Sequence, residues 1–425
     1  MALETIDTLV VGAGQAGIAL SEHLGNHSVP HLVLEKDRVA EAWRSGRWDA
    51  LVTNGPVWHD RFPNLEFEGN AADEFVSKDR VVRYLEDYAK MVAAPIRTGV
   101  SVLSAERLPD RAGFRVETSQ GTIEATRIVA ATGAFQHPVI PPIVPAASPV
   151  TQIHSYEYRN PDALPEGAVL VVGAGSSGAQ IADELNRSGR KVFLSVGPHD
   201  RPPRRYRGRD FVWWLGVLGL WDIAAVEPGT EHVTIAVSGA YGGHTMDFRR
   251  LAHEGVTLLG LTDSYADGTI HFQDDLQKNV AAGDSNYLGM LDAADAYATR
   301  MGLDLPPDHA ARKMWTDPAC LSDPLRQLDL ADQEIATIIW ATGYRRDYGW
   351  LKIDAFEADG APVHQRGVSS EPGVYFLGLP WQSRRGSTFL WGVWHDAKFV
   401  ADQIAIQRAY ADYTGAAAVV QSAAE

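Results

Sequence analysis

Two stretches of the chain repeat one order of hydrophobic and polar positions. The apolar run IDTLVV at 6–11 leads into the segment GAGQAG, a stretch with helical spacing, and the apolar run HLVLE, which ends at Glu35. A second copy begins at about Ala168 with AVLVVGAGSSG and returns as the apolar run KVFLSV. Short apolar runs on either side of a segment with helical periodicity predict a β-α-β unit. We therefore predict two such units in one chain.

The remaining hydrophobic pattern predicts elements that extend both units. Residues 78–92 have the spacing of an amphipathic helix, residues 114–133 that of a hairpin, and prolines crowd a connector at 138–149. Residues 201–330 elaborate the second unit with a hairpin at 255–272 and helices around 276–301. The run EIATIIWATGY at 334–344 repeats the pattern of the earlier RIVAATG, and a strand (GVYFLG) and a helix at 396–413 close the chain.

These elements predict an α/β fold with two Rossmann-like dinucleotide-binding domains. The first domain is discontinuous, built from residues 1–145 and 332–425, and the second occupies residues 146–331. A chain of 425 residues is long enough for two cores of ordinary size.

Composition excludes several classes of function. A formal net charge of −16 argues against nucleic acid partners, because surfaces that neutralise phosphates are basic. Cys320 is the single cysteine, which excludes a redox-active thiol pair within the chain. The apolar run at 211–221 is about half as long as the roughly 20 residues of a transmembrane helix, and no signal peptide pattern opens the chain. We expect a cytoplasmic protein without a metal site, and a homodimer remains open.

The first glycine segment has the residues that a dinucleotide pyrophosphate requires. Gly12 permits the tight turn, Gly14 lets the backbone approach the pyrophosphate, and Gly17 lets the helix pack close to the strand. Backbone N–H groups at the helix start then face the phosphates. Glu35 follows about 20 residues later, where a carboxylate accepts hydrogen bonds from a ribose diol and repels a 2′-phosphate. This segment therefore favours FAD or NAD over NADP.

The second glycine segment has different residues after it. Gly173, Gly175 and Gly178 repeat the three glycine roles, and Ser176 and Ser177 add hydroxyl groups beside the phosphates. Its second strand ends without a carboxylate and is followed by GPHDRPPRRYRGRD, whose arginines suit a ribose 2′-phosphate. The alternative is that these arginines pair with acidic neighbours such as Asp200 and Asp210. The second segment thus predicts NADPH, with Arg204 and Arg205 as candidates for the phosphate contact.

Two such sites predict a resident FAD that is reduced by NADPH. Cys320 has no partner thiol, so oxygen is the expected acceptor, and the reduced flavin is expected to form a C4a-hydroperoxide that the protein must shield from water. The alternatives are an NADPH oxidase or reductase that releases hydrogen peroxide, and a non-catalytic regulatory protein that senses flavin and NADPH.

The chain resembles the class B flavin-dependent monooxygenases, which include flavin-containing monooxygenases, N-hydroxylases and Baeyer-Villiger enzymes. The resemblance rests on both glycine segments in order, on LEKDRVAEAWR, on AATG ending at Gly133, on HSYEYRNP from His154 and on WATGYRRDYGWL. It implies that Trp43 and Arg44 lie near the FAD, that Val102 contacts the adenine, and that Thr342 lies where the two domains meet. It also implies that Asn54 lies beside the reactive face of the flavin; the alternative for Asn54 is a turn residue before Gly55.

Departures from the family pattern narrow the type of oxygenation reaction that we expect. Ser148 and Val150 stand where the fingerprint has Phe and Gly, and Arg159 follows Tyr158 where Baeyer-Villiger enzymes have Pro or Asp. We therefore expect oxygenation of nitrogen or sulfur in a small organic substrate rather than a ketone-to-ester reaction. The segment STFLWGVWHDA is expected to contact the flavin through backbone groups at a helix start.

The complete set of expected site residues has three parts. The residue expected to act in catalysis is Asn54. The residues expected to bind FAD are Gly12, Gly14, Gln15, Ala16, Gly17, Glu35, Lys36, Trp43, Arg44, Val102, Gly133, Trp391 and Gly392, with solvation as the alternative for Lys36. The residues expected to bind NADPH are Gly173, Gly175, Ser176, Ser177, Gly178, Arg204, Arg205 and Thr342.

Overall fold

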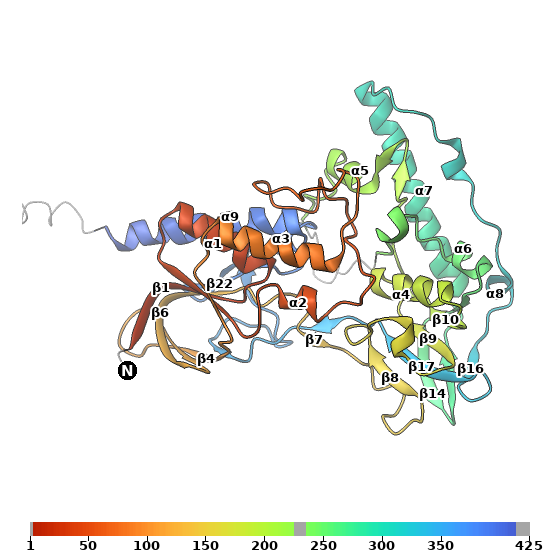
Figure 1. Cartoon of the computed structure of the whole chain (residues 1–425), viewed down its shortest axis with the longest axis horizontal. Helices are drawn as coiled ribbons and strands as arrows, with labels where there is room; N and C mark the ends of the chain where they lie inside the picture. The colour runs from red at the N-terminus through yellow and green to blue at the C-terminus, as the bar shows by residue number, and fades with distance from the viewer. Residues whose placement is uncertain (1–2, 225–234, 414–425) are drawn as a thin grey trace, which may run out of the picture.

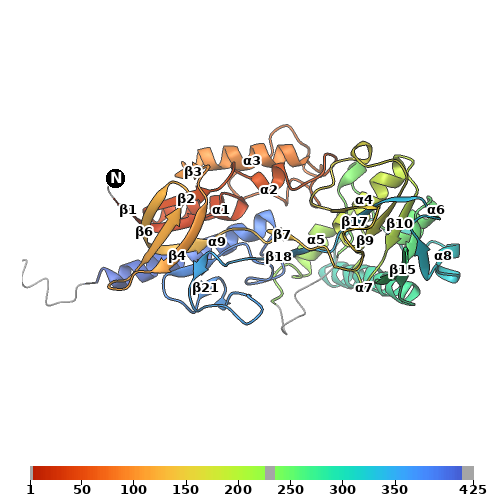
Figure 2. The same cartoon turned by 90° about the horizontal axis from the view of Figure 1, so that it is seen from below.

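The computed structural model describes residues 3–224 and 235–413 of the chain. Two α/β units lie at opposite ends of an elongated molecule (Figure 1), and two short strands, β7 (His137–Pro138) and β18 (Tyr344–Arg345), lie between them (Figure 2). These two strands pair antiparallel, so the two crossings between the units run side by side.

The first unit is built on a ten-stranded mixed sheet. Its main path has the order β19-β4-β5-β6-β1-β2-β3, and β22 joins β6 and carries β21 and β20. Strands β6, β1, β2 and β3 are parallel, whereas β4, β5 and β6 form an antiparallel meander. The strands are β1 (Glu4–Val11), β2 (His31–Glu35), β3 (Ile96–Thr98), β4 (Val102–Arg107), β5 (Phe114–Thr118), β6 (Gly121–Ala130), β19 (Leu351–Lys352), β20 (His364–Gln365), β21 (Val368–Ser369) and β22 (Val374–Phe376).

Helices cover one face of the parallel part of this sheet. The helices of this unit are α1 (Gln15–Asn26), α2 (Glu41–Arg44), α3 (Lys78–Met91) and α9 (Leu390–Ala411). Buried side chains of α1, α3 and α9 form one apolar cluster with Val10, Val33 and Val129 of the strands. The carboxylate of Glu22 on α1 accepts hydrogen bonds from Tyr88 on α3 and Trp394 on α9, which ties the three helices together.

The second unit is built on a five-stranded parallel sheet with the order β13-β10-β9-β17-β8. A three-stranded antiparallel sheet, β14-β15-β16, lies beside it. The strands of the second unit are β8 (Thr151–His154), β9 (Ala168–Val172), β10 (Val192–Ser195), β11 (Arg205–Tyr206), β12 (Arg209–Asp210), β13 (Thr257–Leu259), β14 (Thr262–Ala266), β15 (Thr269–Phe272), β16 (Gln327–Asp329) and β17 (Ile335–Trp340). Its helices are η1 (Pro161–Ala163), α4 (Ser176–Arg187), α5 (Phe211–Val217), η2 (Ala240–Gly242), α6 (Phe248–His253), α7 (Leu276–Met301), η3 (His309–Arg312) and α8 (Ala319–Ser322).

The structure shifts one of the expected domain boundaries. A boundary at 331/332 would place strand β17 in the first unit. In the structure β17 pairs with β9 on one side and β8 on the other, so it belongs to the sheet of the second unit. Apart from Thr337, its residues from Ile335 to Trp340 are apolar on both faces of the strand, as is typical of a central parallel strand. The chain returns to the first unit only through β18.

Candidate functional site

The two glycine segments make equivalent backbone contacts in their two units. Gly12 has φ +111°, and a Cβ there would lie 2.5 Å from the carbonyl oxygen of Ala131; Gly173 has φ +107°, and its Cβ would lie 2.5 Å from the carbonyl oxygen of Ala341. Each alanine follows the strand beside the glycine turn, so the AATG and WATG runs have the same structural role. Only glycine allows this turn so close to the neighbouring strand.

The last glycines of the two segments are also equivalent. A Cβ at Gly17 would collide with the carbonyl of Gly12, and one at Gly178 would collide with that of Gly173. Gly14 differs, because a Cβ there would meet no protein atom within 4 Å. Its small size is therefore not needed for packing, which fits a backbone that a phosphate group approaches.

The carboxylate of Glu35 is held at the first glycine turn by two backbone groups. Its Oε2 accepts a hydrogen bond from the N–H of Ala13 at 2.9 Å, and its Oε1 accepts one from Asp37 at 3.0 Å. Each carboxylate oxygen has a second lone pair, so both can still accept a hydroxyl of a ribose diol. Lys36 is exposed.

Gln15 joins three segments that the sequence assigned to FAD. Its Nε2 donates to the carbonyl oxygen of Thr388 at 2.7 Å, and its Oε1 accepts from Trp43 Nε1 at 3.2 Å. The segment that holds Trp391 and Gly392 indeed begins a helix, and Gly392 packs so closely that a Cβ would collide with the carbonyl of Gly386. The glycine turn, Trp43 and the start of α9 thus meet at one end of the first sheet.

Other predicted FAD residues lie in different surroundings. Ala16 is buried at the first turn of α1, and Gly133 follows β6 with φ +80°. Arg44 forms an ion pair with Glu86 on α3. Val102 lies on β4, where its side chain packs against the apolar cluster on the other face of the sheet. The roles of Arg44 and Val102 in FAD binding stay predictions.

Ser176 of the second glycine segment donates its hydroxyl to the carbonyl oxygen of Ile235 at 2.7 Å, and Ser177 is partly exposed at the first turn of α4.

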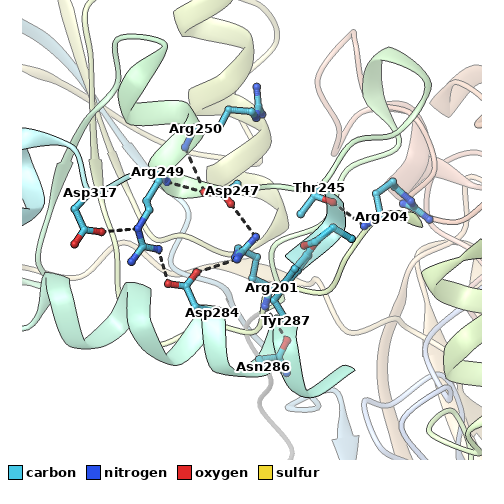
Figure 3. Close-up of polar contacts among 11 residues, drawn as sticks. Arg201, Arg204, Thr245, Asp247, Arg249, Arg250, Asp284, Asn286, Tyr287 and Asp317 are labelled. Atoms are coloured by element: carbon cyan, nitrogen blue, oxygen red, sulfur yellow. Dashed lines mark hydrogen bonds and ion pairs between the residues drawn. The ribbon is translucent and has the colours of Figure 1, made fainter. Parts of the chain in front are cut away.

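The arginine cluster that follows the second glycine segment is largely paired with carboxylates. Arg201 is 3% exposed and donates to Asp247 at 3.0 Å and to Asp284 at 2.8 Å (Figure 3).

Arg204 has a structural position that corrects its expected role in phosphate binding. Its Nε and Nη2 donate to the buried carboxylate of Asp210, and its Nη1 donates to the carbonyl oxygens of Asn54 at 2.7 Å and Ser238 at 3.2 Å. These four bonds occupy four of its five N–H groups and leave no bidentate face for a 2′-phosphate. Arg204 therefore pairs with an acidic neighbour, as the alternative interpretation of the sequence had it. Arg205 is exposed, and its contact with the 2′-phosphate stays a prediction.

Asn54 lies between the two units. Its Oδ1 accepts a hydrogen bond from Gln180 Nε2 on α4 at 2.9 Å, and Gln180 also donates to the carbonyl oxygen of Val237 at 2.6 Å. Gly55 has a packing requirement of its own, because a Cβ would collide with the carboxylate of Asp60. Asn54 lies in a bend of the backbone and also faces the second unit.

A cavity of about 210 Å³ lies beside Asn54 and is lined by both units. Its walls are mostly aromatic and aliphatic, with Asp60 and Arg385 as the charged residues of the lining. Its lining residues are Asn54, Gly55, Asp60, Phe211, Val212, Leu215, Trp221, Ile235, Val237, Pro380, Trp381, Arg385, Thr388 and Phe389. Two of these residues link the cavity to the glycine segments. The carbonyl oxygen of Thr388 accepts a hydrogen bond from Gln15, and that of Ile235 accepts one from Ser176.

The joint between the units contains Thr342 and His154. Thr342 donates its hydroxyl to the carbonyl oxygen of Val139 in the other crossing segment at 2.6 Å. His154 is fully buried; its Nδ1 accepts from the N–H of Tyr156, so its Nε2 is the donor to the carbonyl oxygen of Gly343 at 3.0 Å. Burial lowers the pKa of His154, which agrees with a neutral ring. In this structure His154 fixes the joint.

The sequence did not single out several residues of the cavity. Arg385 and Asp60 are charged residues in irregular segments that match no motif. Gln180 lies one turn into α4, at a position whose sequence pattern does not distinguish a surface residue from one at the cavity. The aromatic run at 211–221, which the sequence analysis considered only for its length, supplies Phe211 and Trp221 to the lining of the cavity.

Three further observations concern the described residues. None of their helices is long and apolar enough to cross a membrane. They contain no group of three or more His, Cys, Asp or Glu side chains that could hold a metal ion. Cys320 lies on α8 and packs against the apolar cluster of the second unit, not at the cavity.

Comparisons with known proteins agree with this architecture. The family described as pyridine nucleotide-disulphide oxidoreductase matches residues 9–207. An uncharacterized CzcO-like oxidoreductase of Geobacillus kaustophilus is 33% identical, with 94% of this chain and 98% of that protein covered. An indole-3-pyruvate monooxygenase of Oryza sativa subsp. japonica is 32% identical, with 94% and 91% covered.

Solved structures share the fold over nearly the whole chain. A flavin-containing monooxygenase from Stenotrophomonas maltophilia superposes with a TM-score of 0.61 at 19% identity, covering 95% of this chain and 99% of that one. A bacillithiol disulfide reductase from Bacillus cereus also has a TM-score of 0.61, at 14% identity, covering 95% and 100%. With two dinucleotide-binding units and relatives of this identity along its length, the chain is an oxidoreductase that belongs to the flavin-dependent monooxygenase family, whose cofactors are FAD and NADPH.

Proposed function

We propose that this protein is an NADPH-dependent FAD monooxygenase that transfers one oxygen atom of O2 to nitrogen or sulfur of a small organic substrate, by the flavin C4a-hydroperoxide route. One observation carries the proposal: a mostly apolar cavity lies between residues tied to each glycine segment, with Asn54 in its wall. A reaction in which a flavin is reduced by one dinucleotide and then oxygenates a third molecule needs such a shared space.

The residues of the first unit suit a bound FAD. Backbone N–H groups at the start of α1 would hold the pyrophosphate, and the oriented carboxylate of Glu35 would hold the ribose. The N-terminal end of α9 would add positive electrostatic potential near the ring system. When bound, FAD supplies the redox and oxygenation chemistry.

The residues of the cavity have two tasks in this proposal. The apolar walls would keep water away from the reacting atoms, which favours oxygen transfer over loss of peroxide. Asn54 would offer its side-chain N–H group, while its Oδ1 is already held by Gln180. Held in this way, the amide cannot turn freely, so one donor has a fixed direction.

The preference for NADPH over NADH is part of the proposal. The strand that follows the second glycine segment, β10, ends at Ser195 without a carboxylate that would repel a 2′-phosphate. Arg205 is the exposed arginine of the candidate pair. Replacing Arg205 with Ala should raise the KM for NADPH and leave that for NADH unchanged.

One experiment tests the reaction itself. The purified holoenzyme is reduced with NADPH in the absence of oxygen and is then mixed with oxygenated buffer while the flavin spectrum is recorded. A transient C4a adduct that forms before peroxide is released is the expected result, because no substrate is present to accept the oxygen atom. Immediate reoxidation with one peroxide per NADPH would make the protein an NADPH oxidase, and no reduction at all would point to a regulatory flavoprotein.

A further inference from the structure

Arg385 brings a positive charge into a cavity whose walls are otherwise mainly apolar. Its side chain is 19% exposed, and its backbone N–H is bonded to the carbonyl oxygen of Ile223 at 2.9 Å. The carboxylate of Asp200 lies 3.9 Å from its Nη2, which is beyond hydrogen-bond distance. Among the described residues, no side chain or carbonyl group accepts a hydrogen bond from its guanidinium.

This position of the partly buried Arg385 differs from those of two fully buried arginines, Arg201 and Arg204. Arg201 donates to two carboxylates, and Arg204 donates to one carboxylate and two carbonyl groups. A guanidinium taken out of water is costly unless charged or polar partners replace the water. Burial lowers the pKa of Arg385, and Asp200 is the group that opposes this effect. Arg385 therefore lacks the close partner that its surroundings call for.

The other charged groups near the cavity are already engaged. Asp60 accepts a hydrogen bond from the N–H of Gly55 at 2.9 Å through one oxygen and contacts the imidazole of His59 at 2.8 Å through the other. Arg384 points elsewhere and pairs with Asp222 at 2.8 Å. Phe211, Trp221, Trp381 and Phe389 supply flat apolar surface around the cavity.

We propose that Arg385 binds a carboxylate group of the substrate, and that the substrate class is an apolar, aromatic-bodied carboxylate. A planar guanidinium pairs with a carboxylate through two parallel hydrogen bonds, and a single guanidinium matches a single negative charge. A pyrophosphate needs more donors, and the two glycine segments provide them. The proposal rests on the proposed function in so far as this cavity is the substrate site.

A binding measurement without turnover tests the proposal. The FAD-loaded protein is titrated with 3-phenylpropanoate and with its neutral amide, 3-phenylpropanamide, and the perturbation of the flavin spectrum gives the Kd of each. The wild type should bind the carboxylate more tightly by about 10- to 100-fold, the range of a charge-assisted hydrogen-bond pair. Equal affinity for the two compounds, or no binding of either, would overturn the proposal.

Four variants assign the preference to its residue. Arg385→Gln should abolish the preference for the carboxylate, Arg385→Lys should keep part of it, and Arg384→Gln should leave it unchanged. Asp200→Asn should strengthen carboxylate binding, because it removes the competing negative charge 3.9 Å from Arg385. FAD content and the melting temperature show that each variant is folded.

A measurement of NADPH affinity distinguishes two anions that Arg385 could bind, a carboxylate of the substrate and a phosphate of the cofactor. The affinity is obtained from the rate of anaerobic flavin reduction at increasing NADPH concentration. If Arg385→Gln weakens NADPH binding and leaves the carboxylate preference intact, Arg385 binds the cofactor and the proposal is wrong. A protein that proves to be an oxidase in the oxygen experiment can still show the carboxylate preference, so the two proposals fail separately.

Discussion

Replacing Arg204 with Gln distinguishes a structural arginine from a phosphate-binding one. In the structure the guanidinium joins Asp210 of the second unit to the carbonyl oxygen of Asn54 in the first, and its carbon lies 4.7 Å from the ring of Phe75 and 4.5 Å from that of Phe211. The substitution removes these contacts and leaves the carboxylate of Asp210, 5% exposed, without its cation.

The expected cost follows from that buried carboxylate. Breaking a buried ion pair by removing one partner costs about 3–5 kcal/mol, because the remaining charge stays in a poorly solvated place. For a unit of about 200 residues, about 2–4 °C of melting temperature per kcal/mol gives a fall of about 6–20 °C. We measure it by thermal unfolding with circular dichroism, with Arg205→Gln as the exposed control, which should change stability by less than about 0.5 kcal/mol.

A second replacement checks the cause. Adding Asp210→Asn to Arg204→Gln should restore part of the stability, because the unpaired charge is then gone. The reasoning is refuted if the Arg204→Gln variant has the melting temperature of the wild type and, relative to the wild type, a raised KM for NADPH and an unchanged KM for NADH. That result would return Arg204 to the role of a 2′-phosphate ligand.

Three other expectations are tested by single substitutions. Gly14→Ala should lower FAD content without changing the melting temperature of the apoprotein, because its Cβ meets no protein atom, whereas Gly17→Ala should destabilise both forms by collision with Gly12. Gln180→Leu should increase peroxide release per NADPH, since it frees the amide of Asn54 and leaves the carbonyl of Val237 unpaired; unchanged coupling would remove Gln180 from the mechanism. Burial raises the pKa of Glu184 to about 7 from 4.5, so the native state favours the protonated carboxyl and stability falls as pH rises through that range. Glu184→Gln should therefore raise the melting temperature near about pH 8 and change it less near about pH 5; an equal effect at both would contradict the shift.

Much of the fold could be predicted from local pattern. The β-α-β units at Gly12 and Gly173 combine apolar periodicity with glycine spacing, and both signals are local in sequence. The assignment of β17 failed because a strand's partners are chosen by sheet order, which periodicity does not contain. A strand apolar on both faces can enter the centre of either sheet.

The candidate site was less accessible to sequence reasoning. Backbone contacts such as those of Gly17 follow from the motif, but the pairing of Arg204 with Asp210 depends on the hairpin of β11 and β12, which turns the chain back so that Arg205 faces Asp210. Asn54 and Gln180 are 126 residues apart and meet only because the two units pack together. Contacts of this kind depend on the complete tertiary structure.

The discontinuity of the first unit also affects the order in which a ribosome can deliver a working enzyme. Strand β22 completes the sheet beside β6, and α9 packs on α1, although these elements come from opposite ends of the chain. The second unit, from β8 to β17, is fully synthesised before either β22 or α9 exists. We therefore expect the second unit to fold during translation, and the flavin to be captured only after β22 and α9 have been synthesised.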